Sequence, residues 1–232
     1  MKCLVTAGPT FEPLDQVRRL TNFSTGKLGS ELANFLTGRG HEVMLLLGEQ
    51  ATWPEPVKAQ SVLSFSTTAD LRAKLEKVSG DGFGAVFHAA AVSDFGFGKV
   101  WQRKTWGELV EVRSGKFRTD LRNLLVELNP TAKIIAELRN WFPSGLLVGW
   151  KFEVEGDRDS VLEKARKQIK ENRTDACVAN GPAYGEGFGL VHASGAIAHT
   201  PSCDALFIKL DEMLHGVTQA TSPSRSATRR AE

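Results

Sequence analysis

Short apolar runs that alternate with helical patterns constrain the fold of this chain more than any other feature. Residues 3–6, 41–47 and 85–91 are nearly continuous apolar runs, as expected for strands covered on both faces of a parallel sheet. Between the first two runs, apolar residues recur at helical spacing from Leu28 to Leu36, and Gly38 and Gly40 end the helix. The alternation predicts an α/β fold, a three-layer Rossmann-like parallel sheet with helices on both faces.

One long stretch interrupts this alternation. Residues 95–123 hold glycines, two tryptophans and many charged side chains, and such a length is unusual for a connection within a compact domain. We expect a protruding flap, hairpin or interface element there. Further elements are predicted at residues 62–66 (strand), 69–78 (helix), 131–141 (helix), 145–150 (strand), 160–172 (helix), 176–179 (strand), 188–198 (hairpin) and 203–214 (helix).

The length of the chain favours one domain or two small ones. Its 232 residues, 41% of them hydrophobic, are enough to bury a full core. We expect residues 1–217 to form one Rossmann-like domain, with 95–123 as a flap or interface insertion. Residues 218–232 contain no large apolar side chain, and this composition predicts a disordered tail.

Composition excludes several classes of protein. A net charge of +2 is too small for a general nucleic-acid or membrane surface, and no apolar run reaches the ~20 residues of a membrane helix. The chain passes from Met1 directly into a strand pattern, so no signal peptide is expected. Cys3, Cys177 and Cys203 are widely spaced and predict reduced thiols. Together these features favour a cytoplasmic protein.

Two glycine turns near the N-terminus indicate a phosphate-binding site. The first follows the first strand at Gly8, and the second, residues 24–29, opens the predicted helix. Free N–H groups at a helix N-terminus, together with the helix dipole, favour an anion. A Walker loop does not fit, because Leu28 follows Gly26-Lys27, and a dinucleotide fingerprint needs more glycines directly after the strand.

The stretch that carries both turns reads TAGPTFEPLDQVRRLTNFSTGKLG over residues 6–29. It closely resembles the N-terminal signature of the phosphopantothenoylcysteine synthetases, which join 4'-phosphopantothenate to cysteine in coenzyme A synthesis. The portion from Asn22 to Gly26 is more similar to the eukaryotic branch of that family than to the bacterial fused enzymes.

The resemblance implies which residues meet the acid substrate. Asn22 matches the family's essential asparagine, whose carboxamide offers donors and an acceptor to an acyl-phosphate-like centre. Residues 89–95, AAAVSDF, match a second family block, so Ala90, Ala91 and Asp94 would contact phosphopantothenate. By themselves, an asparagine before a helix is more often a cap and small residues after a strand are more often packing.

The resemblance also implies a nucleotide site. Residues 149–153 (GWKFE) resemble a block whose aromatic side chain stacks on the base, and residues 175–180 (DACVAN) resemble one whose asparagine reads the base or ribose. A lone tryptophan is more often a core residue, so this role depends on its place in the block. The implied nucleotide contacts are Gly8, Ser24, Gly26, Gly29, Trp150 and Asn180; no residue is implied as a metal ligand.

Three departures from the family pattern concern positively charged positions. Gln168 and Asn172 stand where bacterial members carry two lysines, and Glu111 stands near the basic position of the family's flap. Lys104, our catalytic candidate, and Lys116 are alternative sources of that charge, and the sequence does not choose between them. The family's Ser-Lys near residue 202 is Ser202-Cys203 here.

The leading hypothesis is therefore a phosphopantothenate–cysteine ligase. The phosphopantothenate carboxylate would be activated by ATP or CTP with Mg²⁺ as an acyl-nucleotidylate, and the amine of cysteine would displace the nucleotide. Flavin is not expected, because the synthetase signature begins at residue 3. Family members are typically dimers, so a homodimer is expected.

Two other classes are weighed against the ligase. A short-chain reductase needs a Tyr-x-x-x-Lys pair, and the chain's one tyrosine, Tyr184, is followed four residues later by Phe188. A diverged, non-catalytic nucleotide-binding or interaction protein of the same fold stays open, because fold alone does not determine function.

Overall fold

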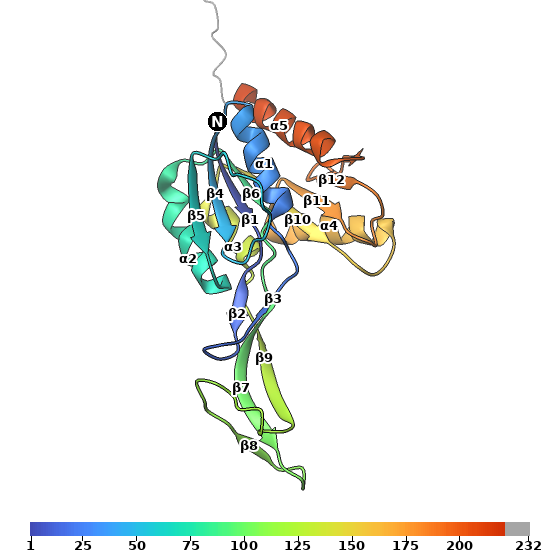
Figure 1. The fold of residues 1–232 in the computed structure, drawn as a ribbon. Helices are drawn as coiled ribbons and strands as arrows, with labels where there is room; N and C mark the ends of the chain where they lie inside the picture. The colour runs from blue at the N-terminus through green and yellow to red at the C-terminus, as the bar shows by residue number, and fades with distance from the viewer. Residues whose placement is uncertain (221–232) are drawn as a thin grey trace, which may run out of the picture.

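The computed structural model describes residues 1–220 and is built around an eight-stranded sheet with helices on both faces (Figure 1). The strand order is β13-β12-β11-β10-β6-β1-β4-β5. The strands are β1 (Lys2–Ala7), β4 (Glu42–Gly48), β5 (Ser61–Phe65), β6 (Ala85–His88), β10 (Leu146–Phe152), β11 (Ala176–Asn180), β12 (Phe188–His192) and β13 (Ile197–Thr200).

The strand order places the carboxyl ends of β1 and β6 at the position where doubly wound sheets have their ligand-binding crevice, and we use the word crevice for this position. From β5 to β11 all pairings are parallel. In chain order these six strands run 3-2-1-4-5-6, the doubly wound order of Rossmann folds. The direction of winding reverses between β1 and β6, and ligands of such sheets bind at this reversal.

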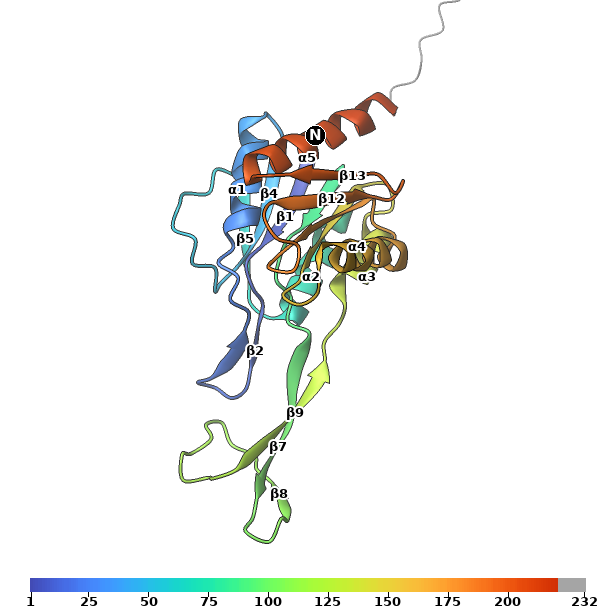
Figure 2. The ribbon, with the colours of Figure 1, turned by 90° about the vertical axis from the view of Figure 1, so that its right-hand side faces the viewer.

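Helices cover both faces of the sheet because side chains alternate along its strands. Cys3, Val5 and Ala7 of β1 face α1 (Lys27–Gly38) and α5 (Cys203–Ala220), whereas Leu4 faces α2 (Thr68–Val78) and α3 (Ile134–Trp141). The helix α4 (Arg158–Asn172) packs on β11 on the same side as α2 and α3, as Figure 2 also shows. The predicted α/β fold, with helices on both faces, is confirmed.

Two antiparallel elements extend below the sheet (Figures 1 and 2). A short hairpin, β2 (Phe11–Pro13) with β3 (Arg19–Thr21), follows β1 and precedes α1 in the sequence. We call the second element the arm: β7 (Phe95–Arg103), the central strand, pairs with β8 (Leu109–Glu111) and β9 (Leu124–Pro130). The expected protruding hairpin is present, but it continues to Pro130 because its return strand β9 lies beyond residue 123.

The hairpin predicted at residues 188–198 is present as β12 and β13, which pair antiparallel and extend the parallel sheet at one edge. Two further boundaries differ from the sequence-based expectation. The strand predicted at 145–150 continues to Phe152, so residues 149–151 lie inside β10 and not at its end. The helix α5 continues to Ala220, so residues 218–220 are helical and not part of a tail, while 221–232 fall outside the described residues.

Within residues 1–220, no helix combines the length and hydropathy needed to cross a bilayer. The three cysteines are free, Cys3 and Cys177 being buried. Whether residues 1–217 fold as one unit stays a prediction.

Candidate functional site

Glycines allow the two predicted turns to touch at the bottom of the crevice. Gly8 follows β1 with φ +81°, and Gly26 precedes α1 with φ +79°. A Cβ added to Gly26 would lie 2.9 Å from the Cβ of Ala51 and 3.4 Å from the Cα of Gly8. Both positive φ values and this close approach favour glycine. The two turns that are 18 residues apart in sequence therefore form one surface.

The first turn of α1 faces this surface. Gly26 is the N-cap of α1 and provides no side-chain hydrogen bond to the helix. The N–H of Lys27 donates to Oγ1 of Thr25 at 3.3 Å, which leaves the N–H groups of Leu28 and Gly29 for an anion. Gly29, on the inner face of α1, is buried, and a Cβ there would lie 2.6 Å from the Cβ of Ala7. Its absent side chain brings the helix against β1, a packing role that sequence analysis did not assign.

The backbone of Ala91 links three chain segments at the crevice. Its N–H donates to the carbonyl of Gly8 at 2.9 Å, and its carbonyl accepts the N–H of Thr10 at 3.1 Å. The same carbonyl accepts Nδ2 of Asn22 at 3.1 Å. Asn22, Gly8 and Ala91 are thus held side by side at the winding reversal. The amide of Asn22 is exposed, and its use of Nδ2 leaves Oδ1 on the open side of this contact.

A buried polar chain beneath Ala90 was missed by sequence analysis. The hydroxyl of Thr6 lies 2.9 Å from Nδ1 of His88 and accepts the N–H of Ala90 at 3.1 Å. This geometry suits a neutral imidazole, and burial lowers the pKa of His88 from 6.5 to about 4. A threonine inside an apolar strand was the available signal, because buried hydroxyls require partners.

The lowered pKa of His88 leads us to expect that the stability of the fold depends on pH. Its pKa is lower in the folded chain than in the unfolded chain, so unfolding takes up a proton between pH 6.5 and 4. The contribution of the neutral imidazole is complete above pH 6.5 and is lost as the pH falls toward 4, by up to about 3 kcal/mol. Urea unfolding at several pH values should show this loss in the wild type and a smaller one in His88→Gln.

Asp94 lies at the exit of the crevice, where the arm begins. Its backbone carbonyl accepts the N–H of Thr131 at 2.9 Å, and the residue is exposed. The preceding turn is held by Thr10, whose Oγ1 accepts the N–H of Ser93 at 2.8 Å and lies 3.3 Å from Oγ1 of Thr68. These hydroxyls fix the path of residues 91–94, so Asp94 stands three residues beyond the carbonyl that Asn22 contacts.

Asn180 belongs to a neighbouring part of the same sheet edge. It ends β11, two strands away from β6, and its buried Oδ1 finds no hydrogen-bond partner within the described chain. It lines a cleft of about 570 Å³ together with Phe152, Gly181, Phe188 and Cys203. A second cleft of about 570 Å³ shares Ser202 and Cys203 and reaches Lys27 at the start of α1. Adjoining clefts therefore connect α1 with Asn180.

Trp150 lies within β10 and packs partly buried against the core between the sheet and α1 and α5. Its Nε1 is buried and has no partner among the described residues. The core covers part of the Trp150 side chain, and its stacking on a base stays a prediction. Ser24 is half-buried in the loop before α1, and its contact with a nucleotide stays a prediction as well.

The two candidate lysines occupy different parts of the arm. Lys104 lies in the turn between β7 and β8, where its Nζ donates to Gln102 Oε1 at 2.6 Å. This turn is at the distal end of the arm, away from the strand ends (Figure 2). Lys116 follows β8 in a segment bonded to the β2–β3 hairpin. Within one chain, the structure does not bring Lys104 to Asn22.

The other departures from the family pattern have local partners. Nε2 of Gln168 lies 3.3 Å from Sγ of Cys177, and Asn172 is buried with Nδ2 bonded to the carbonyl of Gln168 at 2.7 Å. Both lie on the sheet side of α4, which ends near the start of β11, so neither lines the crevice at the strand ends. Glu111 on β8 pairs with Arg113 at 2.8 Å.

Comparisons with known proteins show the family of this chain. The family model described as "DNA/pantothenate metabolism flavoprotein C-terminal domain" matches residues 1–204. The coenzyme A biosynthesis bifunctional protein CoaBC of Thermococcus kodakarensis is 33% identical over 180 residues, which are 77% of this chain and 41% of the relative. The chain thus spans about two fifths of the length of that relative.

Solved structures share the whole architecture. The DNA/pantothenate metabolism flavoprotein of Streptococcus pneumoniae aligns with a TM-score of 0.81 and 26% identity, covering 93% of this chain and 99% of that one. A variant of Cab2 aligns with a TM-score of 0.72 and 17% identity, covering 95% of this chain and 88% of that one, which shows a shared fold. The chain belongs to the family of the DNA/pantothenate metabolism flavoprotein C-terminal domain.

Proposed function

We propose that this chain is a phosphopantothenate–cysteine ligase of coenzyme A biosynthesis. The observation that carries the proposal is the contact of Asn22 with the carbonyl of Ala91, beside Gly8, at the winding reversal of the sheet. Family membership supports it, as do the name of the CoaBC relative and the Cab2 structure, which is described as a complex with phosphopantothenate-cysteine.

The proposed reaction needs positioning more than it needs a nucleophile. The carboxylate of phosphopantothenate attacks the α-phosphate of ATP or CTP, and pyrophosphate leaves. The amine of cysteine then attacks the acyl carbon, and the nucleoside monophosphate leaves. Burial raises the pKa of the thiols of Cys3 and Cys177 to about 12, so neither is a nucleophile at neutral pH. Alignment of the reacting groups and neutralisation of phosphate charge are the main contributions left to the protein.

The roles follow from position in the crevice. We assign Asn22, Ala90, Ala91 and Asp94 to the acid substrate, and the glycine surface with the first turn of α1 to the phosphates. In residues 1–220 no three His, Cys, Asp or Glu side chains form a cation-binding cluster. Mg²⁺ binds nucleotides mostly through phosphate and water oxygens, so the exposed carboxylate of Asp94 is sufficient as a protein donor. When bound, the ion would neutralise phosphate charge.

Asn180 provides a test of the nucleotide cleft. Its buried, unpartnered Oδ1 is an acceptor for a donor such as the exocyclic amine of adenine or cytosine. Asn180→Ala is expected to raise KM for the nucleoside triphosphate roughly tenfold, the cost of a hydrogen bond or two, with KM for phosphopantothenate unchanged. Steady-state kinetics in ATP and in CTP measure both constants. An unchanged nucleotide KM would remove Asn180 from the site.

The arm supports the proposal of a homodimer. Its large apolar side chains are exposed, Trp106 at 94% and Leu109 at 51%, and such a surface indicates a protein contact. Wild type is expected to sediment as a dimer and Leu109→Asp as a monomer. Ile208→Asp on α5, where Ile208 is also 50% exposed, is the matched control and should stay dimeric. A monomeric wild type contradicts the proposal.

The alternative is a protein that binds nucleotide without catalysis, supported by the absence of the flap's basic residue at Glu111 and the distal position of Lys104. Pyrophosphate release with phosphopantothenate, cysteine and either ATP or CTP distinguishes the two. Release that requires both phosphopantothenate and a nucleotide supports the ligase. Nucleotide binding without any release, at chain concentrations where the protein is dimeric, leaves only the alternative.

A further inference from the structure

Asp15 organises the turn at the tip of the β2–β3 hairpin. Its Oδ1 accepts the N–H groups of Val17 at 2.9 Å and Arg18 at 2.8 Å. The N–H of Leu14 donates to the carbonyl of Arg18 at 2.8 Å and closes the loop. One carboxylate oxygen is therefore sufficient to form the turn.

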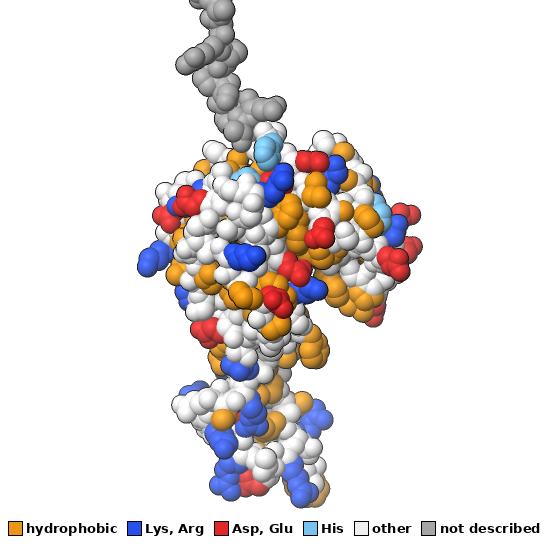
Figure 3. All heavy atoms as spheres, turned by 45° about the horizontal axis from the view of Figure 1, so that its top comes forward, with side chains coloured by type: hydrophobic (Ala, Val, Ile, Leu, Met, Phe, Trp, Pro, Cys, Tyr) orange, Lys and Arg blue, Asp and Glu red, His pale blue; other side chains and the backbone are white. Residues whose placement is uncertain are grey.

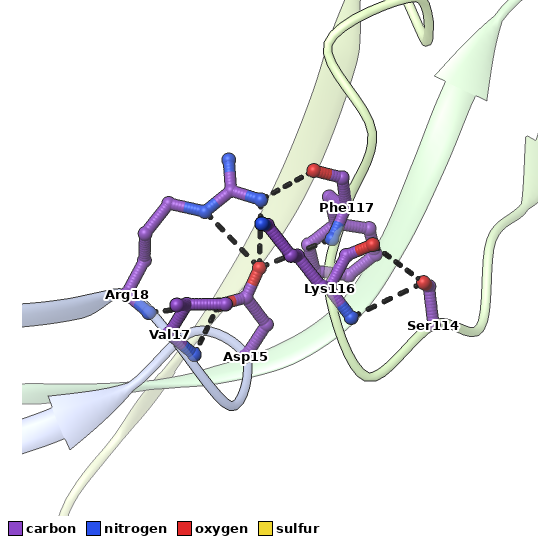
Figure 4. A network of polar contacts seen from close by, with 6 residues as sticks. All are labelled: Asp15, Val17, Arg18, Ser114, Lys116 and Phe117. Atoms are coloured by element: carbon purple, nitrogen blue, oxygen red, sulfur yellow. Dashed lines mark hydrogen bonds and ion pairs between the residues drawn. The ribbon is translucent and has the colours of Figure 1, made fainter.

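The other oxygen of Asp15 binds the arm (Figure 4). Oδ2 accepts the N–H of Phe117, 102 residues away, at 3.1 Å, and it also accepts Nε of Arg18 at 3.1 Å. The guanidinium of Arg18 in turn donates to the carbonyl of Phe117. A further bond joins the N–H of Gln16 to the carbonyl of Gly115 at 2.9 Å. We call this set of contacts the clasp.

The carboxylate at the centre of the clasp is covered and charged, while the side chain of Arg18 is 46% exposed. The side chain of Asp15 has no exposed surface, and Phe117 is 6% exposed. Desolvation acts to raise the pKa of Asp15, but N–H donors from Val17, Phe117 and Arg18, with the Arg18 side chain, outweigh it and lower the pKa to about 2. The carboxylate is therefore ionised at any physiological pH, and the bonds that it accepts are charge-assisted.

The segment that the clasp holds has little other regular structure. Residues 112–118 lie between β8 and β9 outside any strand or helix. Residues 95–123 hold seven Lys or Arg and three Asp or Glu, and Figure 3 shows these basic side chains gathered on the arm. Besides the clasp, the segment is held by the bond of the Val112 N–H to the carbonyl of Val100 at 2.7 Å and by the burial of Phe117, so the clasp is its link to the hairpin.

The clasp connects this segment to the crevice through the hairpin. Arg18 is followed directly by β3, whose last residue, Thr21, donates from Oγ1 to the carbonyl of Thr10 at 2.9 Å. The next residue is Asn22, with Nδ2 on Ala91. A displacement of the hairpin tip therefore reaches Asn22 through a strand of only three residues.

We propose that Asp15 is a positioning residue: its Oδ2 fixes residues 115–117 of the arm to the hairpin, so that arm and hairpin hold Asn22 in register with Ala91 and the acid substrate. This role rests on the ligase function proposed above. The nucleotide cleft at Asn180 is built from other elements and does not depend on the clasp.

The substitution Asp15→Asn tests this selectively. Asparagine keeps an oxygen that can accept the N–H groups of the turn. Its NH₂ group replaces Oδ2, so a donor then faces the donors of Phe117 and Arg18. In the full chain, hydrogen exchange should rise roughly tenfold or more at the Phe117 amide and also rise in β3, since a charge-assisted bond is lost. The kcat/KM for phosphopantothenate should fall roughly tenfold or more, with KM for the nucleotide unchanged.

Asp120→Asn is the matched control. Asp120 lies in the same part of the arm and pairs with Arg118 at 2.8 Å, but its side chain is 62% exposed; exchange and kinetics should stay as in wild type. If Asp15→Asn fails to fold, Arg18→Gln serves as the second variant. It removes the bond to the Phe117 carbonyl and should raise the same exchange rates.

The possible results separate the two proposals. The positioning role is overturned if Asp15→Asn shows faster exchange at Phe117 and in β3 but an unchanged kcat/KM for phosphopantothenate. It is also overturned if the exchange rates do not change. Equal loss of acid and nucleotide binding indicates general destabilisation and overturns it as well. If the wild type releases no pyrophosphate, the ligase proposal fails, and the exchange in β3, together with calorimetric binding of phosphopantothenate to wild type and Asp15→Asn, decides the clasp alone.

Discussion

Replacing Asn22 with alanine is expected to lower kcat for pyrophosphate release roughly 100- to 1,000-fold, the size of effect that follows the loss of one oriented polar group from an active site. The amide is exposed, and its one described bond joins it to the carbonyl of Ala91, so its removal deletes a polar contact at the crevice and little packing. The thermal midpoint should therefore stay within about 2 °C of wild type.

A matched control exists on α3. Asn140 is exposed, accepts a bond from Arg173 at 2.6 Å and lies away from the strand ends, so Asn140→Ala should keep wild-type kinetics. A variant Asn22→Ala that keeps more than about a third of the wild-type kcat would show that this carboxamide does not act in the reaction, because a threefold effect corresponds to only about 0.65 kcal/mol.

The substitution Gly29→Val should have the largest effect on stability. Its Cβ would stand 2.6 Å from the Cβ of Ala7 and 3.0 Å from the carbonyl oxygen of Thr6, and neither atom belongs to a flexible side chain. The helix α1 must then move away from β1, at a cost of about 3 kcal/mol or more. Because we propose that the same helix presents its first turn to the phosphates, nucleotide affinity should fall as well. Urea unfolding and calorimetric titration with ATP or CTP measure the two effects.

Gly38→Val is the control for helix propensity. Gly38 lies in the last turn of α1, and a Cβ there meets no atom within 4 Å, so this variant should be within about 1 kcal/mol of wild type. Similar losses for both variants would mean that valine in the helix, and not the contact with β1, causes the destabilisation.

The sheet and its helices were predictable because they depend on local patterns. Apolar runs such as residues 43–47 have both faces covered, and the helix from Lys27 shows its buried stripe in sequence. The two glycine turns were expected to form a phosphate-binding site, but their contact with each other was not predicted. The structure shows its physical basis, the space that Gly26 leaves for Ala51 and Gly8.

The arm shows where local reasoning stops. Residues 95–123 were recognised as an insertion, yet the strand β9 begins at Leu124, because only pairing with β7 gives these residues an extended conformation. Trp150 was placed at a strand end and lies inside β10. Lys104 was a catalytic candidate on charge alone, and its distance from the crevice within one chain depends on where β7 ends.

The amino-acid sequence by itself determined the α/β class, the positions of most strands and helices and the family, because each is written in side-chain periodicity or in a contiguous motif. Only the tertiary structure decided which distant groups meet: Asn22 with Ala91, Thr6 with His88, and Asp15 with Phe117. These contacts join residues 69 to 102 positions apart, and no local pattern encodes them, because each is set by strand order and by the burial of polar groups that must find a partner.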